Sequence, residues 1–233
     1  MAIMKRNWFC TLTAYLLICY VFMAYGNPLY KPSDKIVLLE NDTISSAIYN
    51  SNFAWFVEFY SSWCGHCQSF APHWKRLARQ VEGWNNVIQV AAIDCAEARN
   101  MKTCENFSIQ GYPTLKFFKA LTKDKKDLGT AYTGGREPHD MRHAMIDFLE
   151  GQGNPRMKLD LKPVSTKMSD KYSEENRLPK PLALVFESNS SYVGKELMLD
   201  LMNNHKITVK RVVNDNVRKI RYKVTRLPQV VLV

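Results

Sequence analysis

The chain has 233 residues, of which 46% are hydrophobic and 23% are charged, and its formal net charge is +10. The length allows one or two domains. The basic side chains are scattered, and the run Lys123–Lys126 is interrupted by Asp124. This pattern indicates a solvated basic surface and excludes a concentrated nucleic-acid interface, so we predict no nucleic-acid partner.

The first residues resemble a secretory signal. Lys5 and Arg6 precede the uncharged run Trp8–Tyr25, which ends in the small-residue exit Ala24-Tyr25-Gly26. We therefore predict a signal peptide over residues 1–26, a location in the endoplasmic reticulum, in the Golgi or outside the cell, and no membrane association after cleavage. The alternative is an uncleaved anchor helix, because the run is nearly long enough to span a bilayer.

The next part of the chain alternates between helical and strand patterns. The predicted elements are a strand at 35–39, a helix at 43–49, a strand at 53–60, a helix at 64–81, a strand at 86–93, a helix at 96–107, strands at 114–119 and 131–133, and a helix at 137–149. Helices interleaved with buried strands predict an α/β domain, over residues 27–152, whose sheet is covered on both faces.

The pattern then breaks and partly repeats. Residues 153–179 are polar and aperiodic, which predicts a linker. A partial second domain is predicted over residues 180–233. Its elements are a strand at 181–187, a helix at 193–203, a strand at 207–213, a short helix at 216–222 and a strand from 229 onwards. Because the sequence stops within that last apolar run, we expect a fragment of a longer protein.

The motif Trp63-Cys64-Gly65-His66-Cys67 lies between a predicted buried strand and a predicted amphipathic helix. The N-terminus of a helix stabilises a thiolate through its free N–H groups and its dipole. A zinc site would need four ligands, and the other cysteines and histidines lack the spacing for one. We therefore predict a redox-active cysteine pair and no metal.

The positions of the residues in this motif predict their roles. Cys64, at the start of the helix, is the expected attacking thiol, and Cys67, one turn later, is the expected resolving thiol. Protonated His66 would favour the thiolate, although an exposed spacer is the alternative. Gly65 leaves room for the backbone of a client protein.

Glu58 and the Tyr112-Pro113 pair are predicted to act beside the cysteines. Glu58 lies in the apolar strand on the same face as Phe56 and Tyr60, and we expect it to accept the proton of Cys67; the alternative is an outward-facing residue. Tyr112-Pro113 precedes a strand, and a cis bond there would turn the Tyr112 backbone toward a client strand. A trans turn is the alternative.

Four cysteines follow the signal segment and allow three pairings. Cys95 and Cys104 flank a predicted helical segment, so a structural disulfide is expected, with a second redox pair as the alternative. Three triplets fit the N-glycosylation pattern, at Asn41, Asn106 and Asn189.

Taken together, residues 53–118 resemble a thioredoxin-fold domain of the protein disulfide isomerase superfamily. The matching features are the WCGHC motif, Glu58 and Tyr112-Pro113. Within that superfamily, the stretches 70–75, 91–97 and 111–120, together with the Cys95 and Cys104 pair, most resemble the first thioredoxin domain of the quiescin-type sulfhydryl oxidases. The resemblance implies a client-binding surface that includes Trp63, Gly65, Tyr112 and Pro113.

Residues 182–213 resemble the second, redox-inactive thioredoxin domain of that family. Ser188–Tyr192 stands where an active domain carries its cysteines, and Leu227-Pro228 resembles the proline element. The resemblance therefore implies a thioredoxin fold with one redox-active domain followed by a truncated, redox-inactive one.

The resemblance also implies a function. The chain would introduce or exchange disulfides in reduced secretory client proteins, as a thiol–disulfide oxidoreductase. It would hold no cofactor itself, because the FAD of the family lies in a separate oxidase domain, and a flavin oxidase domain or partner would receive the electrons. The alternatives are a protein disulfide isomerase of the endoplasmic reticulum and a non-catalytic secreted binding module.

Overall fold

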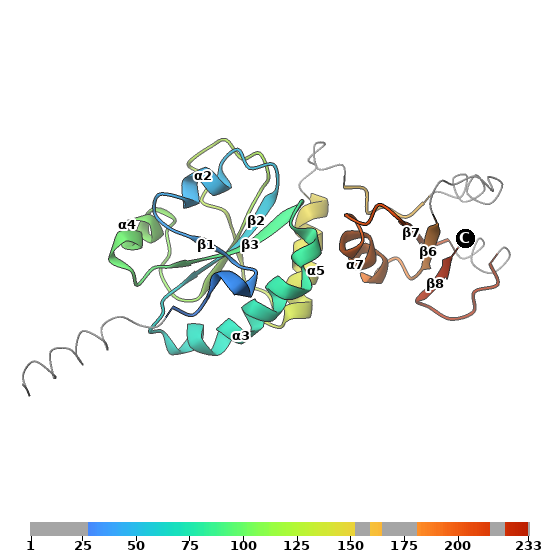
Figure 1. Ribbon diagram of the computed structural model, residues 1–233, viewed down its shortest axis with the longest axis horizontal. Coiled ribbons are helices and arrows are strands. Elements are labelled where there is room, and N and C mark those ends of the chain that lie inside the picture. Colours follow the sequence, from blue (N-terminus) through green and yellow to red (C-terminus); the bar gives the residue numbers. More distant parts are fainter. Residues whose placement is uncertain (1–27, 152–158, 165–180, 215–221, 233) are drawn as a thin grey trace, which may run out of the picture.

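The structure is a computed structural model that describes residues 28–151, 159–164, 181–214 and 222–232. The predicted signal peptide, most of the linker and nearly all of the helix expected at 216–222 lie outside the described residues. The described part contains two sheets, which belong to a first unit over residues 28–151 and a second unit over residues 181–232 (Figure 1).

The first unit alternates strands and helices. Its elements are η1 (Pro32–Asp34), β1 (Val37–Leu39), α2 (Ile44–Ile48), β2 (Ala54–Tyr60), α3 (Gly65–Gln80), η2 (Glu82–Trp84), β3 (Ile88–Asp94), α4 (Ala98–Asn106), β4 (Thr114–Phe118), β5 (Thr130–Tyr132) and α5 (Pro138–Gly151). The strand order is β1-β3-β2-β4-β5. Strands β1, β3 and β2 are parallel, and β4 and β5 continue the sheet antiparallel.

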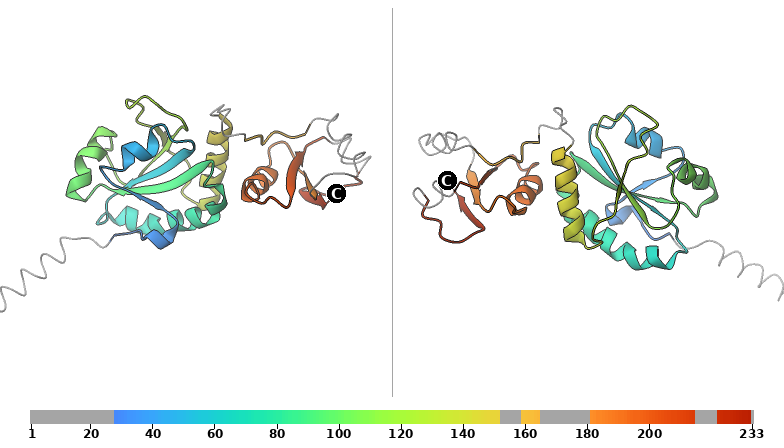
Figure 2. Two further views of the ribbon diagram at one scale, coloured as in Figure 1. Left: turned by 45° about the horizontal axis from the view of Figure 1, so that its top comes forward. Right: turned by 180° about the vertical axis from the view of Figure 1, so that it is seen from behind.

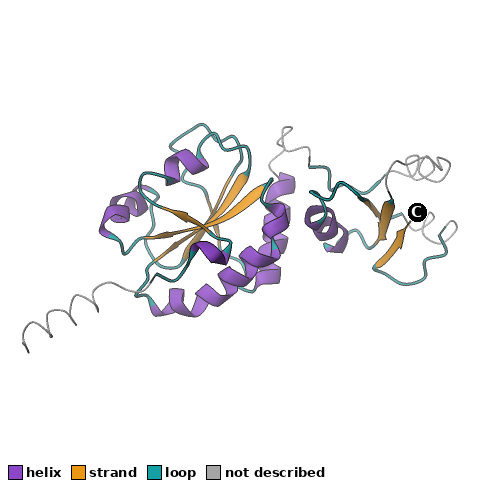
Figure 3. Ribbon diagram, in the orientation of Figure 1, coloured by secondary structure: helices purple, strands orange, loops and turns teal. Residues whose placement is uncertain are grey.

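Helices cover both faces of the sheet of the first unit (Figure 3), and the sheet separates two hydrophobic cores. Side chains of alternate β2 residues point to opposite faces, so Phe56 and Tyr60 pack with α3 and α5, whereas Val57 and Phe59 pack with α2 and α4. Every residue of β2 is buried. The central strand therefore carries side chains from its middle directly beneath α3.

The second unit repeats the central part of this topology. Its elements are β6 (Leu182–Phe186), α7 (Val193–Asp200), β7 (Thr208–Val212) and β8 (Gln229–Leu232), with strand order β7-β6-β8. Strand β6 is parallel to β7 and antiparallel to β8, as β2 is to β3 and β4. A cis X-Pro bond precedes β4 at Tyr112-Pro113 and β8 at Leu227-Pro228.

The two units meet through α7, which lies beside α5 and η2 (Figure 2). The indole Nε1 of Trp84 donates a hydrogen bond to Asp200 Oδ1 over 2.7 Å. The guanidinium of Arg142 lies 5.3 Å from the Trp84 ring centroid, and one of its nitrogens lies 3.6 Å from Asp200 Oδ2. Leu199 is fully buried within the core that α3 and α5 cover. Polar and apolar contacts therefore both join the units.

Most predicted elements are present, with shifted ends. The strand expected at 35–39 begins at Val37, because Lys35 ends η1 with a left-handed φ of 63° and cannot be extended there. The helix expected at 193–203 ends at Asp200, and Asn203 beyond it donates a side-chain hydrogen bond to Gly83 O over 3.0 Å. Contacts between the two units thus lie at the C-terminal end of α7, which the local sequence does not specify.

Within the described ranges, no helix combines the length and the apolar character needed to cross a membrane.

A disulfide joins Cys95, just after β3, to Cys104 within α4, with a Cα–Cα distance of 5.9 Å. Both cysteines are buried in the core beneath α2 and α4. The bond therefore ties α4 to the end of a central strand and lies apart from the free cysteines, Cys64 and Cys67.

We expect the double variant Cys95→Ala with Cys104→Ala to lose about 2–3 kcal/mol of unfolding free energy, because the unfolded chain regains the entropy of an open loop. Urea titration monitored by tryptophan fluorescence measures the loss. Thiol–disulfide exchange at Cys64 should persist in the folded variant. An unchanged midpoint, or loss of exchange while the protein stays folded, would contradict a purely structural bond.

Candidate active site

Two free cysteines lie at the N-terminal end of α3. Cys64 is the N-cap residue, with extended backbone angles, and Cys67 lies in the first turn. Cys64 is partly exposed, whereas Cys67 is fully buried. The strand-to-helix junction therefore gives the two thiols different environments.

Backbone N–H groups of the first turn lower the pKa of Cys64. The largest contribution is a hydrogen bond from the backbone of Cys67; the Cys67 side chain and the His66 backbone act in the same direction. The Cys64 Sγ also lies 3.8 Å from the carbonyl oxygen of Tyr112. Cys64 is thus an accessible thiol with a stabilised thiolate, as nucleophilic attack requires.

Cys67 has the opposite environment. Its pKa is raised to about 12, chiefly by burial; a backbone hydrogen bond from Ser61 opposes this shift, whereas the Cys64 thiol and the charge of Glu58 add to it. A thiol with so high a pKa seldom ionises unless a neighbouring group accepts its proton.

Glu58 lies in the middle of β2 and is 0% exposed. Its place in the strand puts it on the same face as Phe56 and Tyr60, which pack in one core with Cys67. The outward-facing alternative is therefore wrong. Its carboxylate oxygen Oε1 has no hydrogen-bond partner.

Burial raises the pKa of Glu58 to about 8. A hydrogen bond from the Tyr30 side chain and the charge of Arg136 lower it, whereas the charge of Asp94 raises it. The carboxyl group therefore changes protonation state near neutral pH. It can accept or donate a proton in the pH range where a secretory enzyme works.

Neither Tyr30 nor Asp94 was expected from the sequence to act at the site. Tyr30 is 1% exposed, and its hydroxyl donates a short hydrogen bond to Glu58 Oε2. One carboxylate oxygen of Asp94 accepts hydrogen bonds from the N–H groups of Ser62, over 3.2 Å, and Ala96, over 2.9 Å. Asp94 thus fixes the segment that precedes Cys64, and both roles arise only from tertiary contacts.

The other residues expected at the site surround Cys64. Trp63 is 69% exposed, His66 is exposed, and the Cα of Gly65 faces open space. Tyr112 and Pro113 lie across from Cys64 at the start of β4. The three expected glycosylation sites are also exposed, at Asn41, Asn106 and Asn189.

The second unit carries no thiols at the corresponding place. Phe186 pairs with Gln229 as Phe59 pairs with Thr114, each opposite the residue that follows the cis-proline. Counting along both units from these pairs places Val185 at the position of Glu58 and residues 190–194 at that of the motif Trp63–Cys67, whereas the helix N-caps, Cys64 and Tyr192, place α7 one residue later.

A buried ion pair fills the space beside Gly194. A Cβ atom there would lie 2.5 Å from Glu187 Oε1, which forms a short ion pair with Arg211. The other carboxylate oxygen of Glu187 accepts the Gly194 N–H over 2.8 Å. This end of the second unit therefore cannot accommodate a buried resolving thiol without rearrangement.

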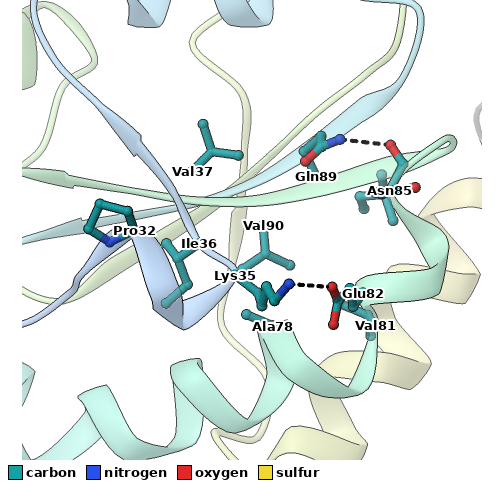
Figure 4. A pocket seen from close by; sticks show the side chains of 11 residues that line it. Pro32, Lys35, Ile36, Val37, Ala78, Val81, Glu82, Asn85, Gln89 and Val90 are labelled. Carbon is teal, nitrogen blue, oxygen red and sulfur yellow. Dashed lines mark hydrogen bonds and ion pairs between the residues drawn. The ribbon is translucent and has the colours of Figure 1, made fainter.

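Two cavities in the described part of the chain lie away from the dithiol. One, of about 280 Å³, is lined by Ile36, Val81 and Val90, with the Lys35–Glu82 ion pair beside it (Figure 4). The other, of about 340 Å³, is lined mainly by charged and polar residues of α3, α5 and α7. Neither cavity is lined by a Trp, Tyr or Phe ring on which a flavin could stack, so the residues of these two cavities do not fit FAD. Among the described residues, no cluster of three or more metal-ligating side chains is found.

Comparison with known proteins finds a family model for each unit. The family model described as Thioredoxin matches residues 35–147, and the model described as QSOX Trx-like domain matches residues 155–233. The fold resembles the crystal structure of full-length ERdj5, with a TM-score of 0.60 and 20% identity; the match covers 85% of this chain and 28% of that one.

Curated relatives are similar over most of the chain. Sulfhydryl oxidase 1 of Homo sapiens is 40% identical over 204 residues, which are 86% of this chain and 27% of the relative. Sulfhydryl oxidase 1 of Gallus gallus is 38% identical, over 93% and 30% of the two chains. Sulfhydryl oxidase 2 of Homo sapiens is 41% identical, over 78% and 26%. The chain thus spans about a quarter to a third of the length of these relatives.

The fold and the dithiol define a thiol–disulfide oxidoreductase of the thioredoxin superfamily. Within it, the chain belongs to the quiescin-type sulfhydryl oxidase family and matches the thioredoxin-like portion of those proteins.

We expect Glu58→Gln to stabilise the protein increasingly as pH rises from about 4.5 to about 8. The raised pKa of Glu58 means that the folded state binds a proton that the unfolded state releases in this range, so wild-type stability falls with rising pH. Glutamine does not titrate. The gain should be near zero at pH 4 and on the order of a few kcal/mol at pH 9.

Thermal melts of both proteins from pH 4 to pH 9 measure this difference. Glu105→Gln, which changes an exposed carboxylate, is the matched control and should show no comparable trend. A stability difference that does not depend on pH would contradict a raised Glu58 pKa.

Proposed function

We propose that this chain exchanges disulfides with reduced proteins of the secretory pathway through Cys64 and Cys67. The observation that carries the proposal is the contrast between the two thiols. One is accessible with a lowered pKa, and the other is buried with a raised pKa in the same core as a buried carboxylate. Such a contrast suits a thiol pair whose members attack in sequence.

The geometry supports the following steps for reduction of a disulfide. The Cys64 thiolate attacks one sulfur of the disulfide, forming a mixed disulfide and releasing the other sulfur as a thiolate that takes up a proton. Glu58 then accepts the proton of Cys67, and the Cys67 thiolate attacks Cys64 Sγ. A Cys64–Cys67 disulfide forms, and the remaining client sulfur leaves as a thiolate.

The same steps in reverse oxidise a reduced client. A client thiolate attacks the Cys64–Cys67 disulfide, and a second client thiolate attacks the resulting mixed disulfide, so that the client leaves with a disulfide and the enzyme as a dithiol. Exposed Trp63 and the Tyr112 carbonyl beside Cys64 offer apolar contact and a hydrogen-bond acceptor to an extended client. The dithiol would then pass its two electrons to a disulfide of an oxidase domain or partner, as the names of the relatives suggest.

The secretory location rests on the signal pattern of residues 1–26. Three exposed glycosylation triplets fit the same location. An oxidising compartment also suits the Cys95–Cys104 disulfide.

We expect Cys64→Ser to abolish exchange and Cys67→Ser to trap mixed disulfides with clients. Serine at 64 removes the attacking sulfur, and serine at 67 removes the sulfur that releases the client. The test uses residues 27–233 with oxidised glutathione or a reduced unfolded client, followed by alkylation and non-reducing mass analysis.

A third variant, Cys95→Ala with Cys104→Ala, controls for general effects of removing cysteines. Mixed disulfides that form on Cys67 in the Cys64→Ser variant would reverse the assigned roles. Equal exchange by wild type and Cys64→Ser would disprove the proposed function.

A further inference from the structure

The hydroxyl of Tyr30 makes a buried contact that the steps above do not use. Tyr30 lies in the segment before η1, far in sequence from the dithiol motif, and its hydroxyl donates to Glu58 Oε2. Tyr30 is 1% exposed and Glu58 is 0% exposed. The other carboxylate oxygen, Oε1, is buried without a hydrogen-bond partner. One oxygen of this carboxylate thus accepts a hydrogen bond, and the other has none.

Several contacts hold the Tyr30 ring in place. The ring packs edge to face on Tyr60, with centroids 5.1 Å apart. The ammonium of Lys75 on α3 lies 5.7 Å from the Tyr30 ring centroid and 3.1 Å from Asp34 of η1. The segment before β1 is therefore fastened to α3, and the tyrosine hydroxyl is directed at the carboxylate by packing on both sides.

We propose that Tyr30 is a positioning residue for proton transfer between Cys67 and Glu58. Its hydroxyl holds Oε2 and leaves Oε1 free to take the thiol proton. The inference rests on the proposed function, because it concerns the step in which Cys67 attacks the mixed disulfide.

The proton balance of that step shows what the hydroxyl contributes. The S–H bond of Cys67 breaks, an O–H bond forms at Glu58 Oε1, and the sulfur then forms a bond to Cys64 Sγ as the client sulfur leaves. Tyr30 neither gains nor loses its proton, because burial and the neighbouring carboxylate raise the pKa of its hydroxyl. It remains a donor throughout and stabilises the ionised form of Glu58.

Other charged and titratable groups act on the same carboxylate. The charge of Arg136, in the loop before α5, favours the carboxylate anion, and the charge of Asp94 at the end of β3 disfavours it. Tyr60, on the same strand, and Cys67, on α3, both interact electrostatically with Glu58. Of the groups that favour ionisation, Tyr30 alone among the described residues makes a direct side-chain hydrogen bond to Glu58.

The test is a pH profile of the two exchange steps in Tyr30→Phe, which keeps the ring and removes the hydroxyl. Reduced protein is mixed with oxidised glutathione, quenched with acid, and analysed by mass spectrometry for the mixed disulfide and the Cys64–Cys67 disulfide. The first step forms the mixed disulfide, and the second forms the Cys64–Cys67 disulfide. We expect the profile of rate against pH for the second step to move to higher pH by about 1 unit, so that this step slows about tenfold at pH 7. The difference should shrink toward pH 9, and the first step should be unchanged.

Three further variants make the result specific. Tyr49→Phe removes the hydroxyl of another buried tyrosine, which donates to the carbonyls of Lys125 and Asp127 on the other side of the sheet, and should match wild type. In Glu58→Gln the second step should lose this pH dependence. Adding Tyr30→Phe to Glu58→Gln should cause no further loss.

The outcomes separate the two proposals. If wild type forms no mixed disulfide with glutathione, the proposed function fails. If wild type reacts but Tyr30→Phe has the same profile for the second step, the positioning role is wrong. An equal slowing of both steps, or a loss that persists in the Glu58→Gln background, would show a merely structural effect and also overturn the role. If Tyr30→Phe unfolds, the proton resonance of the Tyr30 hydroxyl in wild type, with the Tyr49 hydroxyl as reference, decides; a Tyr30 hydroxyl that exchanges with solvent as an unbonded phenol overturns the role.

Discussion

The burial of a carboxyl group in the middle of β2 is the constraint on which the active site depends. An ionised carboxylate without water is costly, so Glu58 either keeps a proton or requires donors and positive charge around it. Tyr30 supplies a donor and Arg136 supplies charge, and each comes from a segment distant in the sequence. The negative charge of ionised Glu58 disfavours ionisation of Cys67, because two negative charges repel each other in the same buried region. One proton shared between them is therefore more favourable than two negative charges, which makes them a natural donor and acceptor pair.

The core of the fold could be predicted from local pattern because β2 and α3 combine strong signals. An apolar run over residues 54–60 leads directly into an amphipathic helix, and both are present within a residue or two of their expected ends. The prediction was least accurate at the ends of strands and helices that tertiary contacts determine. Lys35 takes a left-handed conformation that delays β1, and α7 stops at Asp200, whose carboxylate binds the Trp84 indole. Such contacts cannot be predicted from the sequence of the strand or helix alone.

The same distinction applies to the site. Cys64, Cys67 and Glu58 could be predicted from a motif and from strand alternation, and the structure places Glu58 within β2 and the two cysteines at the start of α3. The roles of Tyr30, Asp94 and Arg136 were not predicted, because they depend on contacts with residues that are distant in the sequence. Tyr30 follows a single leucine in an irregular segment, and no periodicity marks it. A tyrosine there could as well have been exposed, and only the docking of that segment on α3 turns its hydroxyl into a partner of Glu58.

The second unit shows what the same topology becomes without this constraint. Val185 takes the place of the buried carboxylate and the start of α7 carries no cysteine, so both members of the proton-transfer pair are absent together. A buried carboxylate at that position would have no proton to accept, and an apolar side chain packs there at no electrostatic cost. A buried carboxylate does occur two residues further along the chain, at Glu187, but Arg211 forms an ion pair with its Oε1 and the Gly194 N–H donates to its Oε2. In the first unit, by contrast, Glu58 keeps one oxygen without a partner. The first unit therefore combines a dithiol with a buried carboxylate that lacks one hydrogen-bond partner, and the second unit has neither.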